Sequence, residues 1–181
     1  MKLFKYLVLL ILMFSVNAYA QDEMKFEGPI LITSAGQSAD VKLTKLLFDM
    51  QKLQSTTIIM AKTSDLKDVK TLVIVPGFSS KGLGAAGVSV DDEIKRVEEI
   101  VNAANEKEIP ILLLHIGGKA RRKGNSDKFI DIVAKLAKYM IVVEQGNEDG
   151  YFTELSESLN IPLELVDKIP NAGVPIGKLF K

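Results

Sequence analysis

The sequence predicts an α/β three-layer sandwich, Rossmann- or flavodoxin-like, with a mainly parallel sheet of five or six strands. Short apolar runs of strand length alternate along the chain with segments whose apolar residues recur at helical spacing. The strand candidates are also apolar at successive positions rather than at every second one, which is typical of strands buried on both faces of a parallel sheet.

The individual elements follow from local composition. The predicted strands are rich in β-branched residues and are bounded by glycine, proline or polar residues, and they cover 29–33, 56–61, 71–75, 111–116, 139–143 and 163–166. Helical spacing of apolar residues predicts helices over about 41–53, 89–108 and 126–138, and a short helix opening at residue 149. Ser38 is the expected N-cap of the first helix, and residues 89–92 have the pattern of a capping box at the second.

The first 20 residues have the three parts of a secretory signal peptide. Lys2 and Lys5 make a short positive region, residues 6–16 are an apolar run, and residues 18–20 have the small-x-small pattern of a cleavage site. We predict cleavage after Ala20 and export to the periplasm or the extracellular space. Because the apolar run is shorter than the roughly 20 residues that span a bilayer, a permanent anchor is the less favoured alternative.

Removal of these 20 residues from the 181-residue chain leaves 161, with residues 21–28 as a polar lead-in and residues 29–181 as a single predicted domain. The chain has no cysteine, but a domain of this size can fold without a disulfide or a metal. Loss of the two N-terminal lysines changes the formal net charge from +0 to −2. Because nucleic-acid binding favours a broad positive surface, we expect no nucleic-acid partner. Cleavage would also remove the apolar N-terminal run, so we expect no stable membrane span in the mature protein.

If the strands are parallel, the loops that follow them meet at the carboxyl edge of the sheet, where open α/β sheets bind their ligands. Four loops are expected at this edge, and three of them combine glycine with hydroxyl, amide or cationic donors. They cover residues 34–38, 76–87, 115–127 and 144–150. The opposite edge has no comparable concentration of polar donors, so the sequence predicts any binding site at the carboxyl edge.

The loop of residues 115–127, hereafter the basic loop, is the strongest candidate for an anion site. It holds four cations, three glycines and the only histidine, and it leads into a helix whose N-terminus favours negative charge. Arg121 and Arg122 can hold a carboxylate, phosphate or sulfate with paired hydrogen bonds. The open alternative is a solvated loop whose arginines pair with acids such as Asp127 or Glu144. The expected ligand contacts are Arg121, Arg122, Lys119, the backbone of Gly117 and Gly118, and polar groups of Ser34, Gln37, Ser79 and Ser80.

His115 ends an apolar strand at the same edge and is the candidate general base. In a hydrolase or transferase it would take a proton while Arg121 or Arg122 stabilised the developing negative charge. A lone histidine in such a place is more often a hydrogen-bonded structural group, since the chain has no cysteine and no serine in a recognisable nucleophile motif. Both interpretations stay open.

Gly82, Gly84 and Gly87 formally match G-x-G-x-x-G, the fingerprint of dinucleotide binding. The match fails on context, because Gly82 lies seven residues past Val75 and the next predicted strand ends in a histidine rather than in an acid that holds a ribose. We therefore expect no nicotinamide or flavin cofactor. The favoured interpretation is a flexible glycine-rich loop or lid over the sheet edge, with a phosphate-cradling loop as the alternative.

No metal site is predicted. One histidine and no cysteine exclude the common zinc ligand sets, and the acids of residues 144–149 do not have the spacing of a calcium loop. These acids indicate a polar turn that caps a helix.

The chain resembles an uncharacterised family of small exported bacterial proteins, known only as a domain of unknown function. The resemblance is carried by residues 115–122, 126–127 and 149–153, and it extends over essentially the mature chain, including Gly82, Gly87, 160–162 and 179–180. It implies a secreted α/β domain and brings no established activity, substrate or catalytic residue.

The leading hypothesis from the sequence is an exported module that binds a small anionic solute and works beside a transporter or another envelope protein. The first alternative is the hydrolase or transferase that uses His115. The second is an envelope adaptor without a small ligand, in which the glycine-rich loop and Phe78 contact another protein. Fully paired arginines, with no pocket among the four loops, would favour the adaptor.

Overall fold

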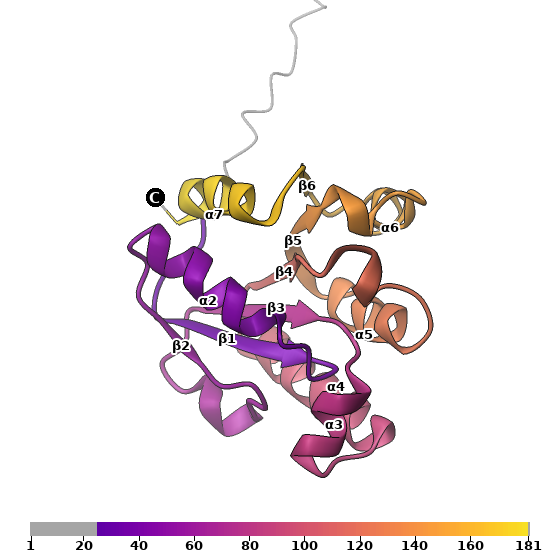
Figure 1. Ribbon diagram of the computed structural model, residues 1–181. Coiled ribbons are helices and arrows are strands. Elements are labelled where there is room, and N and C mark those ends of the chain that lie inside the picture. The colour runs from indigo at the N-terminus through magenta and orange to yellow at the C-terminus, as the bar shows by residue number, and fades with distance from the viewer. Residues whose placement is uncertain (1–24, 181) are drawn as a thin grey trace, which may run out of the picture.

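The computed structural model describes residues 25–180 as a six-stranded, all-parallel sheet with helices on both faces (Figure 1). The predicted signal peptide lies outside the described residues. The strands are β1 (Ile30–Ala35), β2 (Ser55–Thr57), β3 (Thr71–Pro76), β4 (Ile111–His115), β5 (Ala137–Val143) and β6 (Leu163–Val166). Their order, β2-β1-β3-β4-β5-β6, is the flavodoxin order with one further strand beside β5, so the predicted fold class is confirmed.

Helices cover the sheet on both sides and enclose two hydrophobic cores. Alternate residues of β3 show the division, because Leu72 and Ile74 belong to one core while Val73 and Val75 belong to the other, and all four are fully buried. The first core lies under α4 (Val90–Glu106), α5 (Asn125–Ala134) and α6 (Tyr151–Leu159), and the second under α2 (Asp40–Met50) and α7 (Gly173–Leu179). Burial on both faces explains why the strands are apolar at successive positions.

The predicted flexible lid is wrong, because most of it forms a helix, α3 (Ser80–Ala86). The Ser79 side chain accepts a hydrogen bond from the N–H of Gly82 at 3.1 Å and so caps the first turn. At the other end Gly87 adopts a left-handed conformation with φ of 68°, which terminates the helix. The remaining short helical turns are η1 (Thr63–Leu66), η2 (Gly118–Arg121), η3 (Glu144–Gly146) and η4 (Ile169–Ala172).

Several predicted bounds differ from the structure at element ends. The Ser89 capping box with Asp92 is confirmed, and Ser89 directly precedes α4. The N-cap of α2 is Ala39 rather than Ser38, although the Ser38 hydroxyl still accepts a hydrogen bond from the N–H of Asp40 at 3.2 Å. The helix predicted over 126–138 ends at residue 134, because the following residues turn into β5. The edge strand β2 is shorter than predicted and pairs only with β1.

The loops that follow β1, β3 and β4 meet at the carboxyl edge, as predicted. The N–H of Gly77 donates to the carbonyl of Ala35 and the N–H of Ser79 donates to the carbonyl of Gly36, both at 2.8 Å. The N–H of Phe78 donates to the Ser126 hydroxyl at the start of α5 at 3.0 Å. The strand order reverses between β1 and β3, so this convergence lies at the switch point of the sheet.

Candidate functional site

The glycines of the first two loops serve close packing of the protein against itself. A Cβ added to Gly36 would lie 2.8 Å from the carbonyl oxygen of Gly77, and one added to Gly82 would lie 2.4 Å from the carbonyl oxygen of Gln37. Both distances are below any tolerable contact. These glycines therefore let the β1–α2 loop, the β3–α3 loop and α3 approach one another, and the space beside them is filled by the chain.

A buried ion pair of α4 fixes the β1–α2 loop from beneath. The Glu93 carboxylate, whose residue is 1% exposed, accepts a hydrogen bond from the N–H of Gly36 at 2.9 Å. Arg96 binds both Glu93 oxygens at 2.8 and 2.7 Å and donates to the carbonyls of Ser34 and Ala61. This pair was not predicted from the sequence, although the position of Glu93, four residues before Val97 on the buried stripe of α4, indicated it.

Most of the polar residues predicted as ligand contacts in these two loops are buried or form hydrogen bonds within the protein. Ser34 is buried and its hydroxyl accepts a hydrogen bond from the N–H of Ser38 at 2.9 Å, while Ser79 caps α3. Ser80 is exposed at the first turn of α3. Gln37 is 7% exposed, and its amide nitrogen has no hydrogen-bond partner among the described residues. Of the four, Ser80 alone is exposed at the surface.

Arg121 lies across the loops after β3 and β4. Its Nη1 donates to the carbonyl of Phe78 at 3.1 Å, and its Nε lies 3.6 Å from a carboxylate oxygen of Asp40. A Cβ at Gly117 would collide with the Arg121 side chain at 2.2 Å, so this glycine is required for the arginine to fold back over the loop. The Arg121 side chain is 29% exposed and keeps part of its guanidinium toward solvent.

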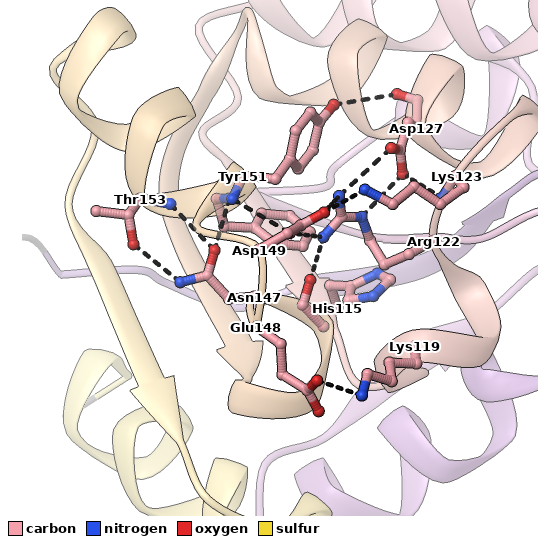
Figure 2. A network of polar contacts seen from close by, with 12 residues as sticks. His115, Lys119, Arg122, Lys123, Asp127, Asn147, Glu148, Asp149, Tyr151 and Thr153 are labelled. Atoms are coloured by element: carbon pink, nitrogen blue, oxygen red, sulfur yellow. Dashed lines mark hydrogen bonds and ion pairs between the residues drawn. The ribbon is translucent and has the colours of Figure 1, made fainter.

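Arg122, in contrast, is the centre of a closed network (Figure 2). Its side chain is 5% exposed, and its guanidinium binds the carboxylates of Asp127 at 2.8 Å and Asp149 at 3.0 Å as well as the carbonyl of Gly146. The Tyr151 ring lies beneath the guanidinium, 4.2 Å from ring centroid to Cζ. Of the two acidic partners predicted for the arginines, Asp127 is confirmed. The second partner of Arg122 is Asp149 and not Glu144.

The ionisation of the network matches its geometry. Burial alone would lower the pKa of Arg122, but its hydrogen bonds and ion pairs with Asp127 and Asp149 raise that pKa above its ordinary value. Hydrogen bonds from Lys123 and then Arg122 hold the pKa of Asp149 well below its usual range. Arg122 and Asp149 are therefore both charged at neutral pH, and Arg122 is held within the protein by its own carboxylates.

The polar turn before α6 acts as the predicted helix cap. The Asn147 side-chain oxygen accepts hydrogen bonds from the N–H groups of Phe152 at 2.7 Å and Thr153 at 3.2 Å, and its amide donates to the Thr153 hydroxyl at 2.8 Å (Figure 2). The cap fixes Asp149 and Tyr151 against Arg122, which joins the start of α6 to the basic loop.

His115 is completely buried beneath this network. Its Nδ1 lies 3.3 Å from the carbonyl oxygen of Pro76 and its Nε2 3.4 Å from that of Gly118, while the Phe152 ring lies 5.0 Å away. Burial is the main cause that lowers the pKa of His115 to about 4, so the ring is neutral at pH 7. This geometry favours the structural interpretation of His115, because neither nitrogen is open to a substrate.

Lys119 and Lys123, the two lysines of the basic loop, lie at the surface and line a pocket. Lys119 pairs with Glu148, and Lys123 pairs with Asp149; the lysine side chains are 71% and 74% exposed (Figure 2). The pocket has a volume of about 310 Å³ and lies between η2 and η3. Its lining residues are Lys119, Arg122, Lys123, Gln145, Gly146, Glu148 and Asp149.

Metal binding and membrane spanning find no structural counterpart in the part of the chain that is described. No cluster of three or more histidine, aspartate or glutamate side chains within residues 25–180 has the arrangement of a metal site. None of the helices in that range combines the length and the apolar composition needed to cross a bilayer.

Residues 27–180 match the family described as Domain of unknown function (DUF6305). The chain belongs to this family. The resemblance to an uncharacterised family with a domain of unknown function is thereby confirmed, and the family description assigns no activity. A search of curated proteins by sequence found no match.

Comparison with solved structures finds esterase-like proteins at low similarity. A GDSL-like lipase from Bacteroides thetaiotaomicron is 12% identical with a TM-score of 0.35, and the match covers 75% of this chain and 66% of the lipase, just under two thirds of its length. A putative acylhydrolase from Bacteroides fragilis is 11% identical with a TM-score of 0.35, covering 83% and 76%. Esterase EstA from Pseudoalteromonas is 15% identical with a TM-score of 0.32, covering 76% of each chain. Likenesses of this size carry no functional argument.

Proposed function

We propose that this domain is exported and binds a small anionic solute in the pocket between η2 and η3, beneath Lys119 and Lys123. The observation that carries the proposal is the exposure of these two lysines and their weak pairing. Each extends over the pocket, each is more than 70% exposed, and each is held by a single ion pair at the surface.

The energetics favour exchange of partners at these lysines. An exposed ion pair contributes roughly 0–1 kcal/mol, so a solute carboxylate, phosphate or sulfate can replace Glu148 as the partner of Lys119 at little cost. Asp149 stays bound to Arg122, so at Lys123 the solute displaces only the surface contact. Arg122 cannot move in the same way, because its side chain is 5% exposed and bound on two sides. It instead holds the wall in shape, with its charge balanced by Asp127 and Asp149. Lys119 and Lys123 are therefore the cations of the pocket that a solute can reach.

The proposed contact set therefore differs from the one expected from the sequence. Lys119 and Lys123 bind the anion, Gln145 adds an amide donor at the rim, and Arg122 holds the wall in shape. Arg121 lies on the opposite side of the basic loop against Gly77 and stands outside this pocket. A role beside a transporter or another envelope protein is part of the same proposal, since export would place the domain where such solutes are collected.

The test is a thermal-shift screen of purified residues 21–181 against phosphate, sulfate, simple carboxylates and sugar acids, because a solute that binds the native state raises the melting temperature. The expected result is a dose-dependent rise that the double variant Lys119→Gln/Lys123→Gln loses. The matched control is Lys107→Gln/Lys138→Gln, which removes the same charge near the amino ends of β4 and β5.

Two outcomes would overturn the proposal. If the control pair loses the shift as fully as the Lys119/Lys123 pair, the response reports net charge and not a site. If no anion shifts a cooperatively folded sample, the adaptor hypothesis takes precedence, and a search for protein partners follows.

A further inference from the structure

Helix α2 carries a second apolar face that the fold leaves uncovered. Its inner face, with Leu47 and Phe48, is buried against the sheet and α7. On the outside, Leu43, Leu46 and Met50 are 44%, 54% and 61% exposed. Their spacing of three and four residues puts them in one stripe along the helix, where a surface helix normally carries polar side chains.

The exposed apolar residues of the described chain are concentrated on this layer. Val174 of α7, which packs beside α2, is a further one at 58% exposure. Large hydrophobic residues exposed elsewhere, such as Ile59 and Leu159, stand singly on different elements. Single exposed apolar residues are ordinary, whereas a stripe marks an interaction surface.

Lysines accompany the stripe. Lys42 and Lys45 lie on α2, and Lys52 follows its end. Lys45 pairs with Asp49, but Lys42 and Lys52 form no ion pair with any carboxylate within residues 25–180. An apolar stripe bordered by lysines is typical of helices that lie on anionic bilayers, where each basic residue near the surface adds roughly 1 kcal/mol of attraction.

The N-terminal end of the described chain emerges beside the same helices. The N–H of Phe26 donates to the carbonyl of Leu179 at 2.8 Å, and the Phe26 ring packs on Phe180, which packs in turn on Phe48 of α2. Lys25 and Lys52 line one surface groove. In the sequence, five peptide steps separate Ala20 from Lys25, at most roughly 18 Å when extended. Before cleavage, an apolar segment inserted in the membrane would hold Lys25, which lines the same groove as Lys52, within that reach of the bilayer.

We propose that the stripe of Leu43, Leu46 and Met50 binds the surface of an anionic phospholipid bilayer, with Lys42 and Lys52 facing the headgroups. The surface is separate from the pocket between η2 and η3, so this inference rests on the proposed export but not on the proposed anion site. A second copy of the chain is the alternative occupant of the stripe, and the test below separates it from a bilayer.

The test is flotation of purified residues 21–181 with phosphatidylcholine vesicles, with and without phosphatidylglycerol. This span contains the whole sheet, its covering helices and both cores. The expected result is binding to the anionic vesicles that weakens with added salt and falls roughly tenfold or more in Leu43→Ser/Leu46→Ser/Met50→Ser. The matched control Ile59→Ser/Leu159→Ser, which removes exposed apolar residues elsewhere, is expected to bind like the unchanged protein. Circular dichroism and melting curves verify that each variant is folded.

The proposal is overturned if the folded triple variant floats as well as the unchanged protein, or if neither vesicle recovers the protein. A concentration-dependent dimer that the triple variant abolishes, without vesicle binding, would assign the stripe to a second copy of the chain instead. The Lys119→Gln/Lys123→Gln variant is expected to float normally, which separates this result from failure of the anion pocket.

Discussion

Truncation of Arg122 to alanine is expected to destabilise the domain far more than the same change at its neighbour Arg121. Arg122 makes five hydrogen bonds, to Asp127, Asp149 and the carbonyl of Gly146, and its guanidinium lies on the Tyr151 ring. Its loss leaves Asp127 and Asp149 without their shared cation, although Lys123 still pairs with Asp149. Removal of one partner from a buried network costs several kcal/mol, and the partial exposure of both carboxylates reduces this to about 3 kcal/mol.

Arg121 has much less to lose. It makes one hydrogen bond to the carbonyl of Phe78 and a long ion pair with Asp40, and its side chain is 29% exposed. We expect Arg121→Ala to cost about 1 kcal/mol. For a domain of this size these losses correspond to a fall in melting temperature of about 6–12 °C for Arg122→Ala and about 2–4 °C for Arg121→Ala.

Urea unfolding followed by circular dichroism measures both free energies, with unchanged m-values as the criterion that the folded and unfolded states stay comparable. Arg122→Lys is the informative control, because it keeps the charge and loses the planar fork and the stacking on Tyr151. It is expected to fall between the unchanged protein and Arg122→Ala. Equal losses at the two arginines, or full recovery by lysine, would refute the assignment of a structural network to Arg122.

Three further predictions concern other parts of the fold. Gly82→Ala is expected to lower the free energy of unfolding by about 1–3 kcal/mol, because the added Cβ meets a backbone oxygen. Gly84→Ala, which has open space around it in the same helix, is expected to be neutral or stabilising. Denaturant midpoints of the two variants check both expectations. The pKa of His115 is about 4 in the folded protein and about 6.5 in the unfolded chain, so the contribution of neutral His115 to stability is complete above pH 6.5. The free energy of unfolding is expected to fall by about 3 kcal/mol as the pH drops to 4. Unfolding measured at a series of pH values checks this, and the His115→Gln variant is expected to lack the pH dependence. Ser89→Ala removes a helix cap and is expected to cost about 1 kcal/mol by thermal melting, without effect on anion binding.

Fold class could be predicted from the sequence because it depends on periodicity, but strand order could not. Hydrophobic patterns report which faces are buried and carry no information on which strands are neighbours. The helix α3 escaped prediction because Gly82 and Gly84 lower helix propensity, even though Ser79 and Gly87 mark its two ends. In that segment the capping residues at the two ends decided the structure, although the glycine content disfavours a helix.

The candidate site could be located at the carboxyl edge, but its members could not be assigned roles. Arg121 and Arg122 are adjacent and chemically identical, and their difference arises from Asp40 and Asp149, which are distant in the sequence. Lys119 was included among the expected contacts, and its exposure over the pocket is a tertiary property. Spacing along the chain shows which donors are available, whereas the partners already bound to them are visible only in three dimensions.

The buried pair of Glu93 and Arg96 makes the beginning of the fold depend on its middle. The N–H of Gly36 and the carbonyls of Ser34 and Ala61 find these partners only once α4 is in place. A chain synthesised from its N-terminus therefore has no partner from α4 for these three groups until Arg96 has been made. The β1–α2 loop reaches its final conformation only when α4 packs beneath it.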